Sequence, residues 1–185
     1  MRIIRGSHRG RQIQPPKSLP VRPTTDYAKE GLFNILEQTF EFGQIEVVDL
    51  FSGTGSISYE FASRGCQKIV AVDANQRCTR FISKTANELG FDNLKVIRSD
   101  VFRFLSKNKQ PFGLVFADPP YDLESIDQLP GLILNGNILH DTAWFILEHP
   151  GKYDFSSHPL FLKHRKYGEV NFSFFEFSGS LKPKD

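Results

Sequence analysis

Residues 112–121 read Phe-Gly-Leu-Val-Phe-Ala-Asp-Pro-Pro-Tyr, an apolar run that ends in a carboxylate and two prolines. A short apolar run between turn residues is typical of a buried strand in a parallel sheet. The prolines end it, because each fixes φ and lacks an N–H donor. The stretch therefore predicts a strand over 112–117 and a stiff turn at the carboxyl edge of the sheet, where open α/β folds bind ligands. Taken alone, Asp118-Pro119 also fits an ordinary turn.

The rest of the chain alternates between strand and helix patterns. Strands are predicted over 45–50, 68–73, 94–97, 112–117 and 143–148. A first helix is expected from about Thr24 to Gly43, and further helices over 56–62, 75–89, 101–105 and 126–134. Two more strands, 160–166 and 170–177, are separated by a tight glycine turn and predict a hairpin. This order predicts a doubly wound, mostly parallel, seven-stranded α/β sheet that ends in an antiparallel hairpin.

The N-terminal stretch differs from the rest in charge. Residues 1–25 contain no acid and six cations: Arg2, Arg5, Arg9, Arg11, Lys17 and Arg22. The other residues carry 17 of the 23 basic side chains and all 21 acidic ones, a net charge of −4. Residues 2–14 predict a small β-hairpin, and the prolines of 15–23 an extended connector. We expect 1–23 to form a basic arm and linker that meets a polyanion, and 24–185 to form one domain; a solvated tail is the alternative.

Composition narrows the class of protein. A length of 185 residues with 39% hydrophobic residues suits one compact domain plus an extension. No apolar stretch approaches the ~20 residues that span a bilayer, and the N-terminus lacks the apolar core of a signal peptide. We therefore expect a cytoplasmic protein with no membrane partner. Cys66, Cys78 and the five histidines show no metal-ligand spacing, so neither a metal site nor a disulfide is predicted.

Acidic residues stand at or just beyond the ends of four predicted strands: Asp49, Asp73, Asp100 and Asp118. One acid in such a place is commonly a helix cap. Because the carboxyl ends of parallel strands lie side by side, four in succession predict a binding crevice at one edge of the sheet.

The turn after the first strand favours a nucleoside ligand. Gly53 and Gly55 let a ligand approach backbone N–H groups at a helix start, and Asp73 follows at an offset suited to ribose hydroxyls. The dinucleotide fingerprint requires a third glycine, and Ser58 stands there instead. An adenosine ligand without a pyrophosphate, with Asp100 near the adenine, fits better than NAD.

These motifs together resemble a known family. The chain is similar to class I S-adenosylmethionine-dependent methyltransferases that act on exocyclic amino groups, and within them to the RsmD family of bacterial small-subunit rRNA guanine-N2 methyltransferases. The resemblance covers nearly the whole chain. It rests on 1–4 (Met-Arg-Ile-Ile) with Gly10-Arg11, 22–24 (Arg-Pro-Thr), 29–36, 49–55 (Asp-Leu-Phe-Ser-Gly-Thr-Gly), 63–65, 118–121 (Asp-Pro-Pro-Tyr) and 165–168 (Arg-Lys-Tyr-Gly).

The resemblance implies a Rossmann-like methyltransferase sheet, S-adenosylmethionine as cofactor and small-subunit ribosomal RNA, in a ribonucleoprotein particle, as the partner of a monomer. It implies catalytic roles for Asp118, Pro119, Pro120 and Tyr121. The implied cofactor-binding residues are Thr24, Asp49, Phe51, Gly53, Gly55, Asp73, Ala74, Asp100, Val101 and Asp118. The implied RNA-binding residues are Arg2, Arg5, Arg9, Arg11 and Arg22.

Other functions stay open at this stage. Asp-Pro-Pro-Tyr also fits a methyltransferase that acts on adenine N6 in DNA or on a protein glutamine. From a different class, the chain could be a non-catalytic RNA-binding module. The segment after Glu148, with His149-Pro150-Gly151, departs from the family pattern and leaves the contacts on the target side undefined.

Overall fold

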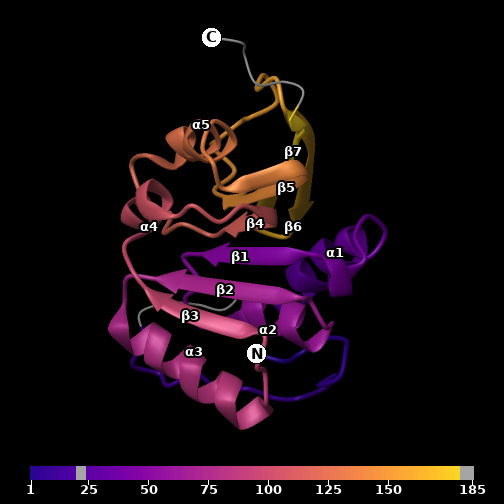
Figure 1. Ribbon diagram of the computed structural model, residues 1–185, viewed down its shortest axis with the longest axis vertical. Coiled ribbons are helices and arrows are strands. Elements are labelled where there is room, and N and C mark those ends of the chain that lie inside the picture. The colour runs from indigo at the N-terminus through magenta and orange to yellow at the C-terminus, as the bar shows by residue number, and fades with distance from the viewer. Residues whose placement is uncertain (20–23, 180–185) are drawn as a thin grey trace.

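A computed structural model describes residues 1–19 and 24–179, and a seven-stranded sheet forms the centre of the molecule (Figure 1). The strand order is β3-β2-β1-β4-β5-β7-β6. The first five strands of this order are parallel, whereas β7 runs antiparallel to β5 and to β6. The strands are β1 (Glu46–Leu50), β2 (Lys68–Asp73), β3 (Leu94–Arg98), β4 (Phe112–Ala117), β5 (Leu139–His149), β6 (Phe161–Tyr167) and β7 (Val170–Phe177). The predicted fold class is confirmed.

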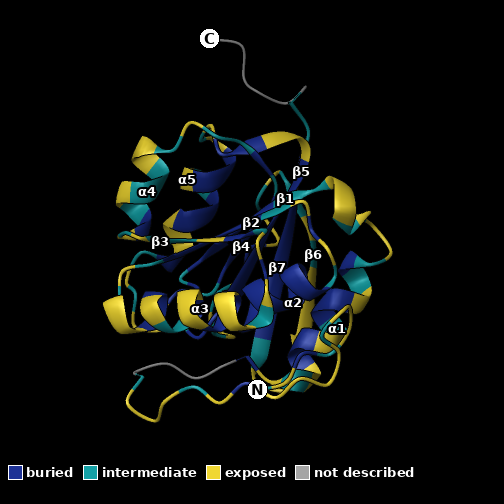
Figure 2. Cartoon of the chain, turned by 60° about the horizontal axis from the view of Figure 1, so that its bottom comes forward, coloured by how far each residue is buried: buried dark blue, intermediate teal, exposed yellow. Residues whose placement is uncertain are grey.

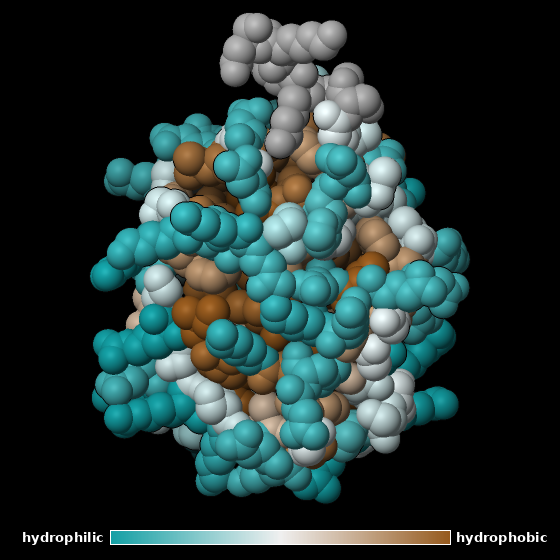
Figure 3. Space-filling view, in the orientation of Figure 1, coloured by the Kyte–Doolittle hydropathy of each residue, from teal (hydrophilic) through white to brown (hydrophobic). Residues whose placement is uncertain are grey.

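Helices cover both faces of the sheet (Figure 2). The helices α1 (Asp26–Leu36), α2 (Ser56–Ser63) and α3 (Gln76–Leu89) pack with one apolar cluster, and α4 (Val101–Lys107) and α5 (Leu129–Leu134) with a second. On the face of Figure 3, apolar residues gather near the middle and polar residues surround them. Among the described residues, no helix is both long and apolar enough to cross a membrane.

Three predicted boundaries differ from the structure by more than two residues. The first helix, expected to reach Gly43, ends at Leu36, and a separate 3-10 turn (Phe42–Gln44) follows it. The helix expected over 126–134 is split into a 3-10 turn (Ile126–Gln128) and α5, because Pro130 lacks an N–H donor and is tolerated only in the first turn of an α-helix. The strand expected over 143–148 begins earlier, at Leu139. Residues 139–142, Leu-His-Asp-Thr, are mostly polar and exposed, so no apolar run indicated them. The pairing of β5 with β4 also shifts register between Phe112 and Leu114.

The N-terminal residues form a hairpin that packs against the body of the protein. A single antiparallel bridge joins Arg2 to Gln12, and the Ile3 N–H donates to the Arg11 carbonyl at 3.0 Å. Ile3 and Ile13 are buried in the apolar cluster that contains α1, α2 and α3. The predicted hairpin is therefore present, as one bridge rather than two strands, and its apolar side is part of the core.

A buried ion cluster attaches this hairpin. Glu60 of α2 is fully buried, and its carboxylate accepts hydrogen bonds from Lys29 Nζ at 3.0 Å and from the backbone N–H of Ile4 at 2.7 Å. Arg64 also pairs with Glu60, and Lys29 Nζ donates to the carbonyl of Arg2 at 2.6 Å. One carboxylate thus joins α1, α2 and the hairpin.

We expect Glu60→Gln to lower the free energy of unfolding by about 3 kcal/mol, because it removes the only buried charge that pairs with both Lys29 and Arg64 among the described residues. Lys29 would keep only a longer contact with Asp26, at 3.8 Å, and Arg64 only its pair with the partly exposed Glu37. Urea denaturation measures the change. The matched control is Glu88→Gln, which removes an exposed pair with Lys84 and should change stability by less than about 0.5 kcal/mol. Equal effects of the two substitutions would contradict the role given to Glu60.

Candidate functional site

A cavity of about 810 Å³ lies at the carboxyl ends of β1, β2, β4 and β5. Of the residues predicted to bind the cofactor or to be catalytic, all but Gly55 line it. Its lining consists of Thr24, Thr25, Asp49, Phe51, Ser52, Gly53, Thr54, Ser56, Ile57, Asp73, Ala74, Asn75, Asp100, Val101, Asp118, Pro119, Pro120, Tyr121, Glu148 and Val170.

The strand register brings the acids to one side of the sheet. Asp49 of β1 is paired with Ala71 of β2 and with Phe116 of β4. Because side chains alternate along a strand, Asp73 and Asp118, each two residues further, lie on the same face as Asp49. That face is the one covered by α1, α2 and α3.

Asp49 is buried at the floor of the cavity. Burial raises its pKa from 3.8 to about 7, and the nearby carboxylates of Asp118 and Asp73 add to the increase. Ser58 donates a hydrogen bond to Asp49 Oδ2 and opposes the shift. The serine that replaces the third glycine of the dinucleotide fingerprint therefore has its own role, which is to hold this carboxylate.

Asp73 and Asp100 are oriented by backbone donors. Asp73 accepts hydrogen bonds from the N–H groups of Gly53 at 2.8 Å and Asn75 at 2.7 Å, one on each carboxylate oxygen. A carboxylate has about four lone-pair positions, so Asp73 can still accept two hydroxyl groups. Asp100 is the N-cap of α4, accepting from the Arg103 N–H at 3.0 Å, and it lines the cavity as well.

The turn between β1 and α2 is conformationally unusual. Phe51 lines the cavity with a φ of 59°, a left-handed conformation that costs a non-glycine residue of order 1–3 kcal/mol. Gly55 has a φ of 78° and does not line the cavity. A Cβ atom at position 55 would lie 2.9 Å from both Ile82 Cγ1 and the Tyr59 ring. Packing of α2 against α3 therefore accounts for Gly55, and its predicted contact with the cofactor stays a prediction.

Asp118 shares the cavity with a carboxyl group that the sequence did not indicate. Ala117 pairs with Leu147, so Asp118 and Glu148 are adjacent across β4 and β5. Burial raises the pKa of both groups, and the Asp118 charge raises that of Glu148 further. Tyr121, which is 47% exposed, donates from its hydroxyl to Glu148 Oε1 at 3.4 Å. Aspartate, glutamate and tyrosine thus form one group at the mouth of the cavity.

Several buried polar atoms of the cavity wall have no partner within the described residues. They are the hydroxyls of Ser52 and Ser56 and the Oε2 atom of Glu148. Buried polar atoms are nearly always hydrogen-bonded in proteins. Two hydroxyls near the start of α2 and a carboxyl oxygen near Asp118 are therefore free to contact a polar ligand.

The predicted RNA-binding arginines do not share one environment. Arg2 and Arg5 form ion pairs with Asp26 and Glu37, at 3.4 and 2.5 Å. Arg9 and Arg11 are exposed, and no acid within the described residues pairs with them. Arg22 lies outside the described residues.

Known proteins share this fold and sequence pattern. Residues 1–176 match the family described as Conserved hypothetical protein 95, the RsmD family of methyltransferases. The chain belongs to this family. Ribosomal RNA small subunit methyltransferase D of Escherichia coli K12 is 30% identical over 148 residues, which cover 80% of this chain and 74% of the relative.

Two solved structures have a fold similar to that of this chain. A Thermus thermophilus protein, described as hypothetical, is 26% identical with a TM-score of 0.84, covering 95% of this chain and 99% of that one. A Salinibacter ruber RNA methyltransferase in complex with S-adenosyl-L-homocysteine is 15% identical with a TM-score of 0.67, covering 89% and 98%. The second likeness concerns the fold alone.

We expect Asp49→Asn to raise the free energy of unfolding near pH 7 by up to about 4 kcal/mol, and to have little effect at pH 4. The folded protein retains a proton on Asp49 that the unfolded chain releases above pH 3.8, so wild-type stability falls as pH rises towards 7. Asparagine removes that dependence. Urea unfolding at both pH values measures it, with exposed Asp127→Asn as control. If the free energy of unfolding fell as much between pH 4 and pH 7 in Asp49→Asn as in the wild type, the role given to Asp49 would be contradicted.

Proposed function

We propose that this RsmD-family chain transfers a methyl group from S-adenosylmethionine to the exocyclic N2 amine of a guanine in small-subunit ribosomal RNA. The observation that carries the proposal is the shared cavity: Asp118-Pro119-Pro120-Tyr121 lines the same space as the residues suited to the cofactor. Family membership supports the reaction, and the E. coli relative is named for methylation of small-subunit ribosomal RNA.

The residues of the cavity fit S-adenosylmethionine. Asp73 would accept the ribose hydroxyls, since each of its oxygens keeps a free lone pair. Asp100, Val101 and Ala74 would surround the adenine. The unpartnered hydroxyls of Ser52 and Ser56, with Thr24, Asp49 and Gly53, would hold the methionine end. When bound, the cofactor supplies an activated methyl group on a positively charged sulfur.

Asp118 and Pro119 would orient the amine. The guanine N2 nitrogen is a weak nucleophile, because its lone pair is delocalised into the ring. The Asp118 carboxylate and the Pro119 carbonyl would accept its two N–H bonds and hold the nitrogen near tetrahedral geometry, with its lone pair turned into the cavity. Alignment of this kind supplies most of the rate for a transfer whose leaving group is already present. The proton leaves afterwards, to Asp118 or to water.

Tyr121 and Glu148 would complete the target side. Tyr121 would stack on the guanine and fix its plane, as aromatic residues do for unpaired RNA bases. Its exposure at the cavity mouth leaves the ring accessible to a base that has left its stack. Glu148 would hold a proton beside Asp118, because two charges so close together in a buried site repel each other.

We propose that the substrate is recognised by its shape and charge, through the cations at the N-terminus. We assign residues 1–23 to a basic arm and linker, and 24–185 to the methyltransferase domain. Arg2, Arg5, Arg9, Arg11 and Arg22 would contact phosphates of a folded RNA, in an assembling ribonucleoprotein particle. We expect a monomer that acts in the cytoplasm, where its ribosomal substrate is.

The decisive experiment incubates the protein with labelled cofactor and small ribosomal subunits, and maps the methylated nucleotide. We expect one N2-methylguanine with wild type and none with Asp118→Ala. Cofactor affinity of Asp118→Ala should stay within about tenfold of wild type, roughly 1.4 kcal/mol. Asp122→Ala, at an exposed neighbouring acid outside the cavity, should retain wild-type activity.

Parallel assays with plasmid DNA and with a release factor test the two other amino-group substrates. Methylation of adenine or glutamine, with no N2-methylguanine in small-subunit RNA, would overturn the proposed substrate. Wild-type turnover by Asp118→Ala would overturn the proposed role of that carboxylate.

We expect kcat/KM to fall as pH drops from neutral towards 5, because Asp118 becomes protonated well above the usual pKa of 3.8. In Glu148→Gln, kcat/KM should fall at the same pH as in the wild type. The pKa of Glu148 is raised further than that of Asp118, so the substitution exchanges a neutral acid for a neutral amide over that range. If kcat/KM of Glu148→Gln fell only at a lower pH than in the wild type, Glu148 would be ionised in the wild type.

A further inference from the structure

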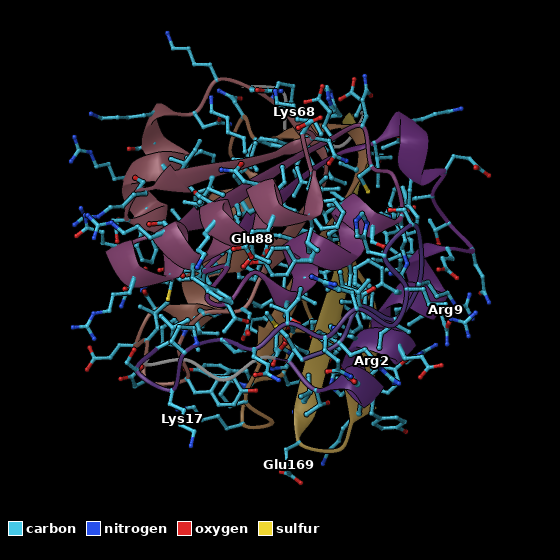
Figure 4. All side chains as sticks on the ribbon, turned by 90° about the horizontal axis from the view of Figure 1, so that it is seen from below. Arg2, Arg9, Lys17, Lys68, Glu88 and Glu169 are labelled. Carbon is cyan, nitrogen blue, oxygen red and sulfur yellow. The ribbon has the colours of Figure 1, made fainter. Side chains whose placement is uncertain are left out.

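A second concave surface lies between the N-terminal hairpin and α3, away from the cofactor cavity. It is a groove of about 470 Å³. One wall comes from residues 11–14 and Pro16, and the other from the outer side of α3. The α3 residues that line it are Arg77, Arg80, Phe81, Lys84, Thr85, Glu88 and Leu89. We call this surface the α3 groove. Figure 4 labels Arg9 and Lys17 near the ends of the N-terminal stretch that borders it, and Glu88 on α3.

The α3 groove is positively charged. Arg11 contributes one cation from the hairpin, and α3 contributes three more at helical spacing: Arg77, Arg80 and Lys84. All four are exposed. Glu88 is the one acid among the lining residues, and it pairs with Lys84 at 3.7 Å. Within the described residues, no acid pairs with Arg11, Arg77 or Arg80.

The floor of the α3 groove is apolar. Ile13 is buried beneath it, and Phe81 and Leu89 are half-buried against the core cluster while still lining the groove. Cationic walls over an aromatic floor suit a single-stranded nucleic acid, since cations meet the phosphates and an aromatic ring accepts a base. A duplex would reach the cations but leave the floor unused.

The groove and the cofactor cavity share one helix. Asn75, the N-cap of α3, lines the cavity, and Arg77 of the groove follows two residues later. RNA bound along α3 can therefore reach the rim of the cavity at Asn75, and the strand then crosses the mouth of the cavity to bring a base to Tyr121 on the target side. No sequence motif indicates this surface, because Arg77, Arg80 and Lys84 are spread along an ordinary amphipathic helix.

We propose that the α3 groove binds the phosphates of the single-stranded RNA that flanks the target guanine, through Arg11, Arg77, Arg80 and Lys84. This rests on the proposed function and deepens it: RNA is held by α3 together with the hairpin, and not by the hairpin alone. Phe81 offers the adjoining nucleotide a partial stacking surface. Arg2 and Arg5, which are engaged by acids, contribute less to this contact.

The test compares Arg77→Gln/Arg80→Gln with a control that removes equal charge, Lys107→Gln/Lys109→Gln. The control lysines lie at and just beyond the end of α4, on the opposite face of the sheet. Affinity for a full-length small-subunit rRNA transcript is measured by filter binding between 50 and 200 mM salt. Each single-strand phosphate contact contributes about 0.7 to the slope of log K against log salt, so the α3 variant should lose about 1.4 from the slope and bind roughly 25-fold more weakly at 0.1 M.

Further measurements separate binding from catalysis. Cofactor affinity and the rate at saturating transcript should be unchanged in the α3 variant, while the KM for RNA rises. Arg11→Gln alone should lower the slope by about 0.7, which tests the hairpin wall independently.

The measurements distinguish a failure of the groove proposal from a failure of the proposed function. An unchanged slope in both Arg77→Gln/Arg80→Gln and Arg11→Gln would overturn the groove, even if the wild type methylates the transcript. If the wild type transfers no methyl group to the transcript or to small subunits, the proposed function fails, yet the slopes still decide whether the groove binds RNA. If the Lys107→Gln/Lys109→Gln control lost as much slope, the effect would come from the net charge of the protein and not from the α3 groove, and the groove proposal would be overturned.

Discussion

The crowding of acidic groups at one edge of the sheet constrains the rest of the structure. Asp49, Asp118 and Glu148 are brought to that edge by parallel strand register, and burial raises the pKa of all three. Charged carboxylates so close together in a poorly solvated space are unfavourable. A ligand that carries positive charge and N–H donors relieves this repulsion. The same acids therefore reduce the stability of the fold and, under the proposed function, would give the cavity an affinity for a sulfonium and an amine.

The N-terminal hairpin is held by a different electrostatic arrangement. Glu60 is buried with two cations and with a backbone N–H of the hairpin, so its charge is fully compensated. This attachment fixes the hairpin against α1 and α2, beside the cavity. It also decides which cations face outwards. Arg2 pairs with Asp26 of α1, and Arg5 pairs with Glu37, the residue after α1. Arg9 and Arg11 are therefore the hairpin arginines that can present charge to a partner.

Periodicity and motif position predicted most of the fold and most of the cavity lining. The seven strands, their order of appearance and the strand-end acids follow local rules of apolar patterning and turn chemistry. Glu148 could not be found this way, because a single glutamate at the end of an apolar strand has no local signature. Its role depends on the register of β4 with β5, which places it beside Asp118. The docking of the hairpin was missed for a similar reason: Ile3 and Ile13 are two apolar residues in a polar stretch, and their partners lie on α1, α2 and α3.

The acids lie inside the cavity and the exposed cations lie outside it, and this arrangement constrains how RNA can approach. Phosphates would be repelled by Asp118 when it is ionised, and the buried acids Asp49 and Glu148 offer them no positive charge, so the cavity is unfavourable for the backbone of a nucleic acid but not for a neutral base. The cations of the α3 groove lie outside the cavity but on the helix that begins at its rim. An RNA strand can satisfy both conditions only if its backbone stays on the outer surface and one base turns inwards. Charge placement alone thus favours an extruded nucleotide, and the tyrosine at the mouth provides the surface on which that base would rest.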